Sequence, residues 1–494
     1  KINIIGASPY KHKEMRFTKY TALLALTLLL GACTTDFQEI NTNPNSPIEV
    51  QPSLLLRQVI YNYGEEMSYE GFVAGNLLGQ YFTAIDFNLF DRHSLTEPQF
   101  GGNPWPVLYT NLRDNEIILE QVKTNEALAV YEGPALIMKA YLAMALTDIY
   151  GDVPYSDALR GTQGVVTPTY DDQTAIYQSA GGILDNLTNG IAAIENYQGS
   201  IALEGDILFG GELDGWVRFA NALRIKALMR ISGQVDVSSE LQTIYDGDNF
   251  INTNAENATF DFTDGQPNNF RMANLRAGDF NLFIMSETIE EILTALNDPR
   301  QEVWFRPIGN DPDQTTYEGF LNGPDASQTS ISVADYSLTG TIFRERTGDL
   351  DANFLTAWET HFLLAEAAER GLITANAQDL YETGVTQAFE YWQTSLPADY
   401  LTSGAAAYGD NGADPIAQII TQKWLANIIN GYEGWIEYRR TGFPALKTIS
   451  ASLNNDLIPV RMPYPTDEAA LNASNFSAAA AATDGNSINA RVWG

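Results

Sequence analysis

Apolar side chains recur at helical spacing through most of the chain after Leu54, in stretches of roughly 12 to 20 residues. Apolar residues separated by three and four positions lie on one face of a helix, so each stretch can bury that face against a neighbour. The clearest stretches are 135–150, 214–232 and 416–429. This pattern predicts a mainly α-helical fold with a few short strand hairpins at most.

Two pairs of helical stretches are separated by short connections. The stretch 354–370 ends at Gly371 and is followed by 377–392, and the stretch 139–150 is followed by 174–195. Paired antiparallel helices of this length are the unit that stacks in tetratricopeptide-type folds. A strict repeat of about 34 residues is not visible, so this expectation rests on the helical hairpins alone.

Two long regions lack this helical spacing. They span 79–106 and 252–347, and both are rich in Asn, Asp, Gly and aromatic residues. Long stretches without regular structure inside a compact domain are usually functional. We therefore expect the two regions to form a loop-rich part of the molecule that binds a ligand.

The N-terminal residues have the layout of a bacterial export signal. A basic stretch at 15–20 precedes an apolar run at 21–30, and the run leads into Leu30-Gly31-Ala32-Cys33. An apolar run of about ten residues fits the core of a signal peptide, whereas a membrane-spanning helix needs roughly 20. Small residues suit a peptidase that grips an extended backbone, and the thiol can take up a diacylglycerol. We expect cleavage after Ala32 and lipid attachment at Cys33; the alternative is a buried cysteine at the end of a core helix.

The expected organisation has three parts. Residues 1–32 are removed; of these, 1–14 precede Met15 and do not read as part of the signal. Residues 33–52, rich in Asn, Thr and Pro, form a lipidated tether. The hydrophobic content of 45% can fill a large core, so residues 53–494 are expected to form a single domain. Since no other apolar run reaches spanning length, the protein is expected to lie on a membrane without crossing it.

The chain is strongly acidic, with 28 Lys and Arg against 62 Asp and Glu and a formal net charge of −34. Such a surface repels phosphate backbones, so nucleic acid is not an expected partner. Solubility in a salty environment is the simpler role of this charge. With Cys33 lipidated, no thiol remains for a disulfide, for thiol catalysis or for a zinc site.

Several stretches together resemble the SusD/RagB family of nutrient-binding outer-membrane lipoproteins, in its SusD-like branch. The matching segments are 141–154 (YLAMALTDIYGDVP), 216–232 (WVRFANALRIKALMRIS), 358–371 (WETHFLLAEAAERG), 416–444 (IAQIITQKWLANIINGYEGWIEYRRTGFP) and 458–465 (IPVRMPYP), with Asn472 after them. The family usually carries an aromatic-Ala-Glu sequence where Trp358-Glu359-Thr360 stands here. The resemblance extends from Cys33 to about residue 475.

This resemblance implies a SusD-like fold, with tetratricopeptide-like helix pairs on one side and an irregular, loop-rich ligand-binding region on the other. It implies an outer-membrane location facing outward from the cell, and a TonB-dependent, SusC-like barrel transporter as partner. It further implies that the protein captures oligosaccharide, polysaccharide or peptide, delivers it to that transporter, and catalyses nothing.

The residues that match the family best are expected to belong to the scaffold. An Arg439-Arg440 pair beside Glu433 and Glu437 is typical of a partly buried ion-pair network, because guanidinium groups hold carboxylates bidentately. The same interpretation applies to the remaining members of this group, namely Gln422, Lys423, Trp424, Trp435, Arg218, Arg224 and Arg230.

The first irregular region holds the leading candidates for ligand binding. Flat rings can stack on the apolar faces of sugars, while polar side chains fix the hydroxyl groups by hydrogen bonds. Both kinds of residue are concentrated in Tyr81, Asp86, Phe87, Asn88, Phe90, Asp91 and Arg92. The alternative is that the aromatic residues only anchor a long loop to the core.

The second irregular region adds Arg271, Trp304 and Tyr317 as candidates. Trp304 follows a turn at 298–300 that resembles a family scaffold element, so a structural role is the alternative for it. Trp105, which leads into a helix, is expected to belong to the core.

Catalysis and metal binding find little support in the sequence. The chain has only three histidines, of which His361 lies in a predicted packed helix, so a zinc cluster or a Ser-His-Asp set is not expected. No cofactor is expected. Calcium binding by loop carboxylates is an alternative that no EF-hand spacing supports.

The function expected from the sequence is glycan binding. An oligopeptide-binding protein of the same family is the alternative, and a helical glycoside hydrolase that uses two carboxylates is a further one.

Overall fold

The computed structural model describes residues 50–95, 100–311, 313–449 and 451–493. The predicted export signal, the lipidation site at Cys33 and most of the predicted tether lie outside these residues. Pro52–Gly494 form one compact unit, and this unit alone is described below.

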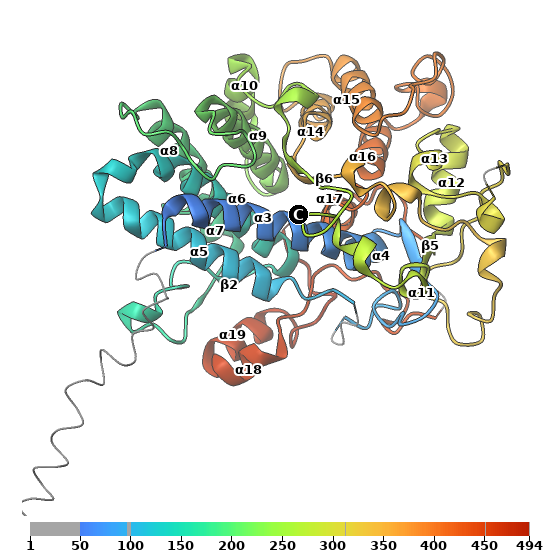
Figure 1. The fold of residues 1–494 in the computed structure, drawn as a ribbon, viewed down its shortest axis with the longest axis horizontal. Helices are drawn as coiled ribbons and strands as arrows, with labels where there is room; N and C mark the ends of the chain where they lie inside the picture. The colour runs from blue at the N-terminus through green and yellow to red at the C-terminus, as the bar shows by residue number, and fades with distance from the viewer. Residues whose placement is uncertain (1–49, 96–99, 312, 450, 494) are drawn as a thin grey trace, which may run out of the picture. The chain divides into compact units, whose positions relative to one another are not determined.

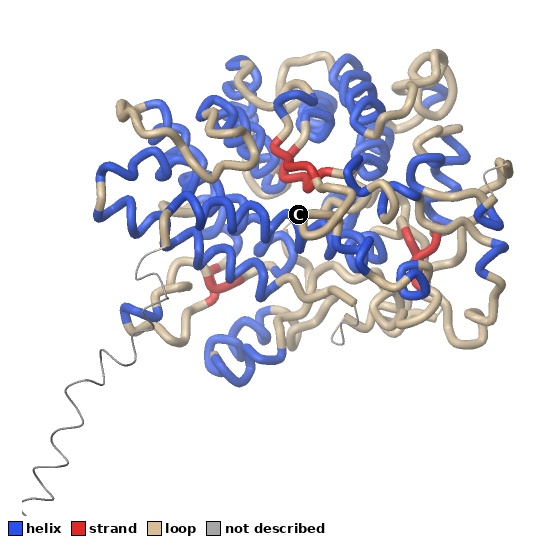
Figure 2. Tube along the Cα trace, in the orientation of Figure 1, coloured by secondary structure: helices blue, strands red, loops and turns tan. Residues whose placement is uncertain are grey.

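Helices predominate in this unit (Figures 1 and 2). The first half contains α3 (Pro52–Glu70), which continues through a π-helical turn (Gly71–Gly75) into α4 (Asn76–Leu78), and then α5 (Trp105–Thr124), α6 (Glu132–Tyr150), α7 (Gln173–Gln178), α8 (Ile183–Glu195), α9 (Leu213–Ile231) and α10 (Ser238–Gly247). The second half contains α11 (Ala277–Phe280), α12 (Glu287–Leu296), α13 (Gln301–Trp304), α14 (Ala357–Glu369), α15 (Ala377–Tyr391), α16 (Pro415–Ala426), α17 (Glu433–Thr441), α18 (Thr466–Leu471) and α19 (Ala473–Ala482).

Strands are short, and those of the described residues form antiparallel pairs. The pairs are β1 (Phe82–Ala84) with β5 (Phe283–Met285), β2 (Val153–Pro154) with β3 (Tyr170–Asp171), and β4 (Ala258–Asp261) with β6 (Asp351–Leu355). The first pair joins the two irregular regions, with Phe82 opposite Met285. The predicted mainly α-helical fold with few strands is confirmed.

The helices pack in a continuous series. α3 packs on α5, α5 on α6, α6 on α8, α8 on α9 and α9 on α14, which in turn contacts α15 and α16. Apolar side chains of α3, α5, α6, α8, α9, α14 and α16 meet in one large buried cluster, while those of α15 form a second cluster with others of α14 and α16. Among the described helices, none combines the length and apolar character needed to cross a membrane.

The two predicted helical hairpins differ in outcome. The hairpin of 354–370 with 377–392 is confirmed as α14 and α15, which pack together, and Gly371 between them has the left-handed φ of 69° that ends a helix. The second prediction was partly wrong, because 174–195 is two helices rather than one. α7 and α8 are separated at Gly181, whose φ is 77°.

Two other predicted boundaries also change. The helix predicted at 416–429 ends earlier, at Ala426. Ile429 has a φ of 64°, which lies outside the right-handed helical region. The region 252–347 is less irregular than predicted, since it contains α11, α12 and α13. Ser286 caps the N-terminus of α12, its hydroxyl accepting the backbone N–H of Thr288 at 3.0 Å.

Buried ion pairs join the helices, as the sequence predicts for the residues that match the family. Arg230 of α9 bonds Asp148 of α6 at 3.0 Å and also pairs with Glu433 of α17. Lys226, one turn earlier in α9, contacts Glu359 of α14 at 3.0 Å and Glu433 at 2.9 Å. Burial alone would raise the pKa of Glu433, but Lys226 and Arg230 outweigh it and lower that pKa to about 2. Four helices are therefore held together by charge as well as by apolar packing.

Candidate functional site

Four residues follow one another in space near the surface, with Phe87 exposed, Phe100 and Arg271 partly exposed and Tyr69 buried between them. Phe87 is 51% exposed, and its ring stands edge-on to Phe100 with centroids 5.7 Å apart. The backbone carbonyl of Phe100 accepts a hydrogen bond from the Tyr69 hydroxyl at 2.9 Å. The Arg271 guanidinium lies 4.3 Å from the centre of the Tyr69 ring. We refer to Tyr69, Phe87, Phe100 and Arg271 as the aromatic strip.

The backbone around Phe87 holds its ring outward. Phe87 has a left-handed φ of 49°, which is uncommon for a residue with a bulky side chain. The Asp86 carboxylate accepts the N–H of Phe87 at 2.8 Å, and the Asn88 amide donates to the carbonyl of Pro324. Arg92 extends this support, since its Nε donates to the carbonyl of Ala451 at 2.8 Å. Three of the predicted polar residues therefore shape the loop that presents Phe87.

Carboxylates of α3 line the other end of the strip. Arg271 pairs with Glu66, and Glu65 lies beside it on the same helix. Burial, followed by the charge of Glu66, raises the pKa of Glu65. The exposed ring of Phe87, with the partly exposed guanidinium of Arg271 and the two carboxylates, provides both apolar contact and directed hydrogen bonds. That combination suits a ligand with apolar faces and several hydroxyl groups.

Several predicted site residues lie in the core instead. Tyr81 is 1% exposed and stacks on Trp424, with ring centroids 4.0 Å apart. Trp304 is fully buried against Trp392, at a centroid distance of 5.3 Å. Phe90 is also buried. A ring with no exposed face cannot stack on a ligand, so we leave these three residues out of the proposed site.

Asp91 is buried as well and holds the backbone of neighbouring segments. Its carboxylate accepts the N–H groups of Ala84 at 3.1 Å and Gly323 at 2.8 Å, and the Thr83 hydroxyl at 2.8 Å. Burial raises the pKa of Asp91 to about 6 in spite of these bonds. This carboxylate fixes the loop from inside and does not face solvent.

Tyr317 lies apart from the strip, half-buried near Glu302, and burial raises the pKa of its hydroxyl. Of the predicted residues, the structure thus brings together Phe87 and Arg271, with Asp86 at the base of Phe87. Trp105 is buried, as predicted, and so is His361, whose Nε2 lies 2.9 Å from the carbonyl of Asn252.

Sequence reasoning missed Tyr69 and Phe100. Tyr69 is the last member of a series on α3 with Tyr61 and Glu65 at spacings of four, so the three lie on one helix face. Tyr61 stacks on Phe260 at 5.6 Å, and its hydroxyl donates to the carbonyl of Pro267 at 3.3 Å. Polar and aromatic residues repeated at this spacing were the signal by which the sequence could have identified Tyr69.

Among the described residues, no group of three or more His, Cys, Asp or Glu is placed to hold a metal ion.

The stacked helix pairs and the loop-rich side that carries the aromatic strip define the class of fold. The chain belongs to the SusD-like family, described as starch-binding and associating with the outer membrane, whose model matches residues 44–465. This confirms the resemblance stated from the sequence. No curated protein matches the chain.

Solved structures show the same fold. One described as a chitin-binding protein is 25% identical, with a TM-score of 0.75 over 90% of this chain and 99% of that one. A SusD homologue from Bacteroides fragilis is also 25% identical, with a TM-score of 0.77 and the same coverage. A chitin-binding SusD homologue from Flavobacterium johnsoniae is 22% identical, with a TM-score of 0.74 over 90% of this chain and 97% of that one. At this last identity the likeness concerns the fold alone.

Proposed function

We propose that this protein is a cell-surface lipoprotein that captures an oligo- or polysaccharide through the aromatic strip and passes it to a TonB-dependent, SusC-like transporter. The observation that carries the proposal is the strip itself, in which the exposed Phe87 is linked through Phe100 and the buried Tyr69 to the partly exposed Arg271. Membership of the SusD-like family, described as starch-binding, supports a glycan as ligand. The similar chitin-binding protein supports it further.

The strip binds by stacking and hydrogen bonding. The ring of Phe87 offers an apolar face to the C–H groups of a sugar, and Arg271 and Glu66 offer donors and acceptors for its hydroxyls. Tyr69 links these parts and fixes the position of Arg271 through its ring. No bond of the ligand needs to break for this role, so the protein acts as a binding protein and not as an enzyme.

The ligand class is tested by calorimetry of the purified protein against a panel of polysaccharides and against peptide digests. We expect saturable binding of at least one glycan and none of the digests. Binding of peptides without any glycan would overturn the choice of ligand and favour the oligopeptide alternative. Release of reducing sugar from a bound polysaccharide would instead favour the glycoside hydrolase.

The partner is tested separately. Purification of the protein from detergent-solubilised outer membranes of its own organism should yield a barrel transporter in comparable amount. Recovery of the protein alone, under conditions that preserve other outer-membrane complexes, would contradict the delivery step while leaving glycan capture untouched.

A further inference from the structure

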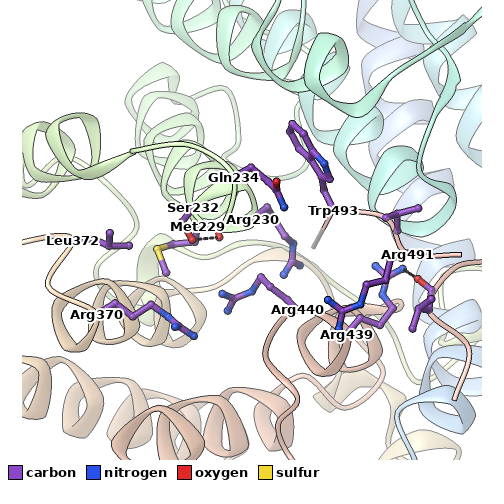
Figure 3. A pocket seen from close by; sticks show the side chains of 13 residues that line it. Met229, Arg230, Ser232, Gln234, Arg370, Leu372, Arg439, Arg440, Arg491 and Trp493 are labelled. Carbon is purple, nitrogen blue, oxygen red and sulfur yellow. Dashed lines mark hydrogen bonds between the residues drawn. The ribbon is translucent and has the colours of Figure 1, made fainter. Parts of the chain in front are cut away.

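A cavity of about 260 Å³ lies where the C-terminal end of α9 meets α17 and residues 491–493 (Figure 3). It shares no residue with the aromatic strip. Five of its lining side chains are arginines: Arg230, Arg370, Arg439, Arg440 and Arg491. Since the chain has 62 acidic residues and only 28 basic ones, five arginines around one cavity are an unusual concentration of positive charge.

Three of these arginines have carboxylate partners. Arg230 pairs with Asp148 at 3.0 Å. Arg370 and Arg440 both pair with Glu366, Arg370 at 2.7 Å. These pairs leave the guanidinium groups held in place around the cavity. Side chains fixed in this way lose little further entropy when a ligand binds.

Arg439 and Arg491 have no carboxylate within 4.0 Å among the residues that the structure describes. The sequence predicts that Arg439 pairs with a glutamate, and this was wrong: its Nη1 donates to the carbonyl of Val460 at 2.7 Å, and its Nη2 to that of Asp148. Its guanidinium also lies 4.1 Å from the centre of the Trp435 ring. Burial lowers the pKa of Arg439, although the charges of Asp148 and Glu433 act in the opposite direction.

Positive charge exceeds negative charge beside the cavity. The ion-pair network itself is balanced: its five cations are Lys226, Arg230, Arg370, Lys423 and Arg440, and its five carboxylates are Asp148, Glu359, Glu366, Glu433 and Glu437. Arg439 lies next to this network, bonded to the backbone carbonyl of Asp148, and is the cation in excess. Arg491 adds a further positive charge at the rim. An unbalanced buried cation is costly in a medium of low dielectric constant. An anion in the cavity would restore neutrality.

The dimensions limit the ligand to a small one. Sites for drug-sized molecules occupy roughly 300–1,000 Å³, so this cavity has room for one oxyanion or one sugar residue. Guanidinium groups match the oxygen spacing of carboxylate, sulfate and phosphate. In Figure 3 the indole of Trp493 and the amide of Gln234 lie beside the arginines, and Gln234 is exposed. These two side chains can contact the body of an organic anion.

We propose that this cavity is a binding site for a small oxyanion. Two sources share the required chemistry: free inorganic sulfate or phosphate, and the acid group of a uronate or sulfated sugar. In either case the anion accepts hydrogen bonds from the arginines, and Arg491 closes over it from the rim.

The test is thermal unfolding and calorimetry of the whole protein with sodium sulfate, sodium phosphate, glucuronate and glucose. Ionic strength is held constant with sodium chloride, because an acidic chain responds to salt in general. We expect a saturable rise in melting temperature with an oxyanion but not with glucose. Preference for sulfate or phosphate identifies an inorganic ligand, preference for glucuronate identifies an acidic sugar, and either supports the site. Equal responses to chloride and to all oxyanions would overturn it.

Variants locate the binding. Arg491→Ala removes an exposed side chain that forms no ion pair with any described residue, so the protein should fold normally and bind the oxyanion at least tenfold more weakly. Arg439→Gln should abolish binding. Arg113 is an exposed arginine of α5 that pairs with Asp114. Arg113→Ala is the matched control and should bind the oxyanion as the unaltered protein does. Phe87→Ala should also leave oxyanion binding unchanged, because the cavity does not depend on the aromatic strip. Undiminished binding by Arg491→Ala would place the anion elsewhere.

Discussion

Phe87 and Trp304 are both aromatic residues of loop-rich segments, but their surroundings differ completely. Phe87 is 51% exposed at the end of the strip, whereas Trp304 is fully buried between Trp392 and Arg300. The sequence predicted both residues to bind ligand from their residue type and their place in an irregular region. Neither property reveals which ring faces solvent. Exposure depends on long-range partners such as Trp392, which lies 88 positions further along the chain.

Replacing these two rings should have opposite effects. Phe87→Ala should weaken glycan binding by roughly 1–3 kcal/mol without lowering the melting temperature, because the ring contributes to stacking and little to the core. Trp304→Ala should destabilise the fold by about 3–5 kcal/mol. Calorimetry and thermal unfolding measure the two quantities.

A matched control accompanies this pair. Ile201 is 47% exposed, similar to Phe87, and lies outside the strip, so Ile201→Ala should change neither quantity. If Phe87→Ala binds the glycan as tightly as the unaltered protein does, the strip is not the binding surface.

Asp351 should make the stability of the fold depend on pH. It lies opposite Asp261 in the β4–β6 pair, and burial together with the charge of Asp261 raises the pKa of Asp351 to about 7. The unfolded chain releases this proton near pH 4, so the folded state binds more protons between about pH 4 and pH 7. Stability is therefore lost as the pH rises through that range.

Asp351→Asn should remove this loss. We expect the variant to be more stable than the unaltered protein at pH 8, by on the order of 1 kcal/mol, and equally stable near pH 4. Denaturant unfolding across this pH range measures the difference. Parallel stability profiles for the two proteins would show that Asp351 does not hold the proton.

At the scale of the elements, two backbones come very close together where the π-helical turn after α3 meets the segment after α16. A Cβ atom added to Gly75 would lie 1.9 Å from the carbonyl oxygen of Gly431, and one added to Gly71 would lie 2.3 Å from that of Ile429. The two glycines are four positions apart and so face the same segment. Asn76 adds a hydrogen bond, its Oδ1 accepting the N–H of Ile429 at 3.1 Å. This contact fixes the direction in which the chain leaves α16.

Gly75→Ala should therefore destabilise the protein by about 3 kcal/mol, because the obstructing atoms are backbone and cannot move aside cheaply. Gly247→Ala is the control. It is also a helical glycine, nothing lies within 4 Å of its added Cβ, and the substitution should be neutral or stabilising by roughly 0.4–1 kcal/mol. Thermal unfolding of both variants measures the difference in stability. Equal melting temperatures for Gly75→Ala and Gly247→Ala would contradict the close contact.

Helices were the most predictable elements, because apolar spacing reports directly on a buried face. The ends of helices were less predictable. The chain beyond α16 is held at Ile429 by the close backbone of Gly71 and by the Asn76 side chain, which accepts the N–H of Ile429. Both residues are more than 350 positions away in the sequence. The break between α7 and α8 depends on Gly181, which helical spacing alone does not show.

Across the whole molecule, the functional surfaces come from segments that are far apart in the chain. The strip takes residues from α3, from the loop after β1 and from the segment before α11, while the arginine cavity takes them from α9, α17 and residues 491–493. Family resemblance predicted the fold as a whole. It gave no signal for the cavity, since arginines in the matching segments are expected to pair internally, as Arg230 and Arg440 do.

The proposed membrane attachment rests on one residue. Cys33 is the only cysteine of the chain, and no described helix can span a membrane. Cys33→Ser should therefore move the protein from the detergent phase to the aqueous phase when cells are extracted, because the acyl chains provide the affinity for lipid. Phe87→Ala should stay in the detergent phase. If Cys33→Ser also stays there, another part of the protein contacts the membrane.

The distribution of tryptophans gives the molecule an optical property. Seven of the eight tryptophans are buried, and the exception, Trp493, lines the arginine cavity. A collisional quencher such as acrylamide can reach the fluorescence of Trp493 far more easily than that of the other seven. The emission that such a quencher removes therefore reports on the cavity, and a bound anion that shields the indole should restore it without any dye attached to the protein.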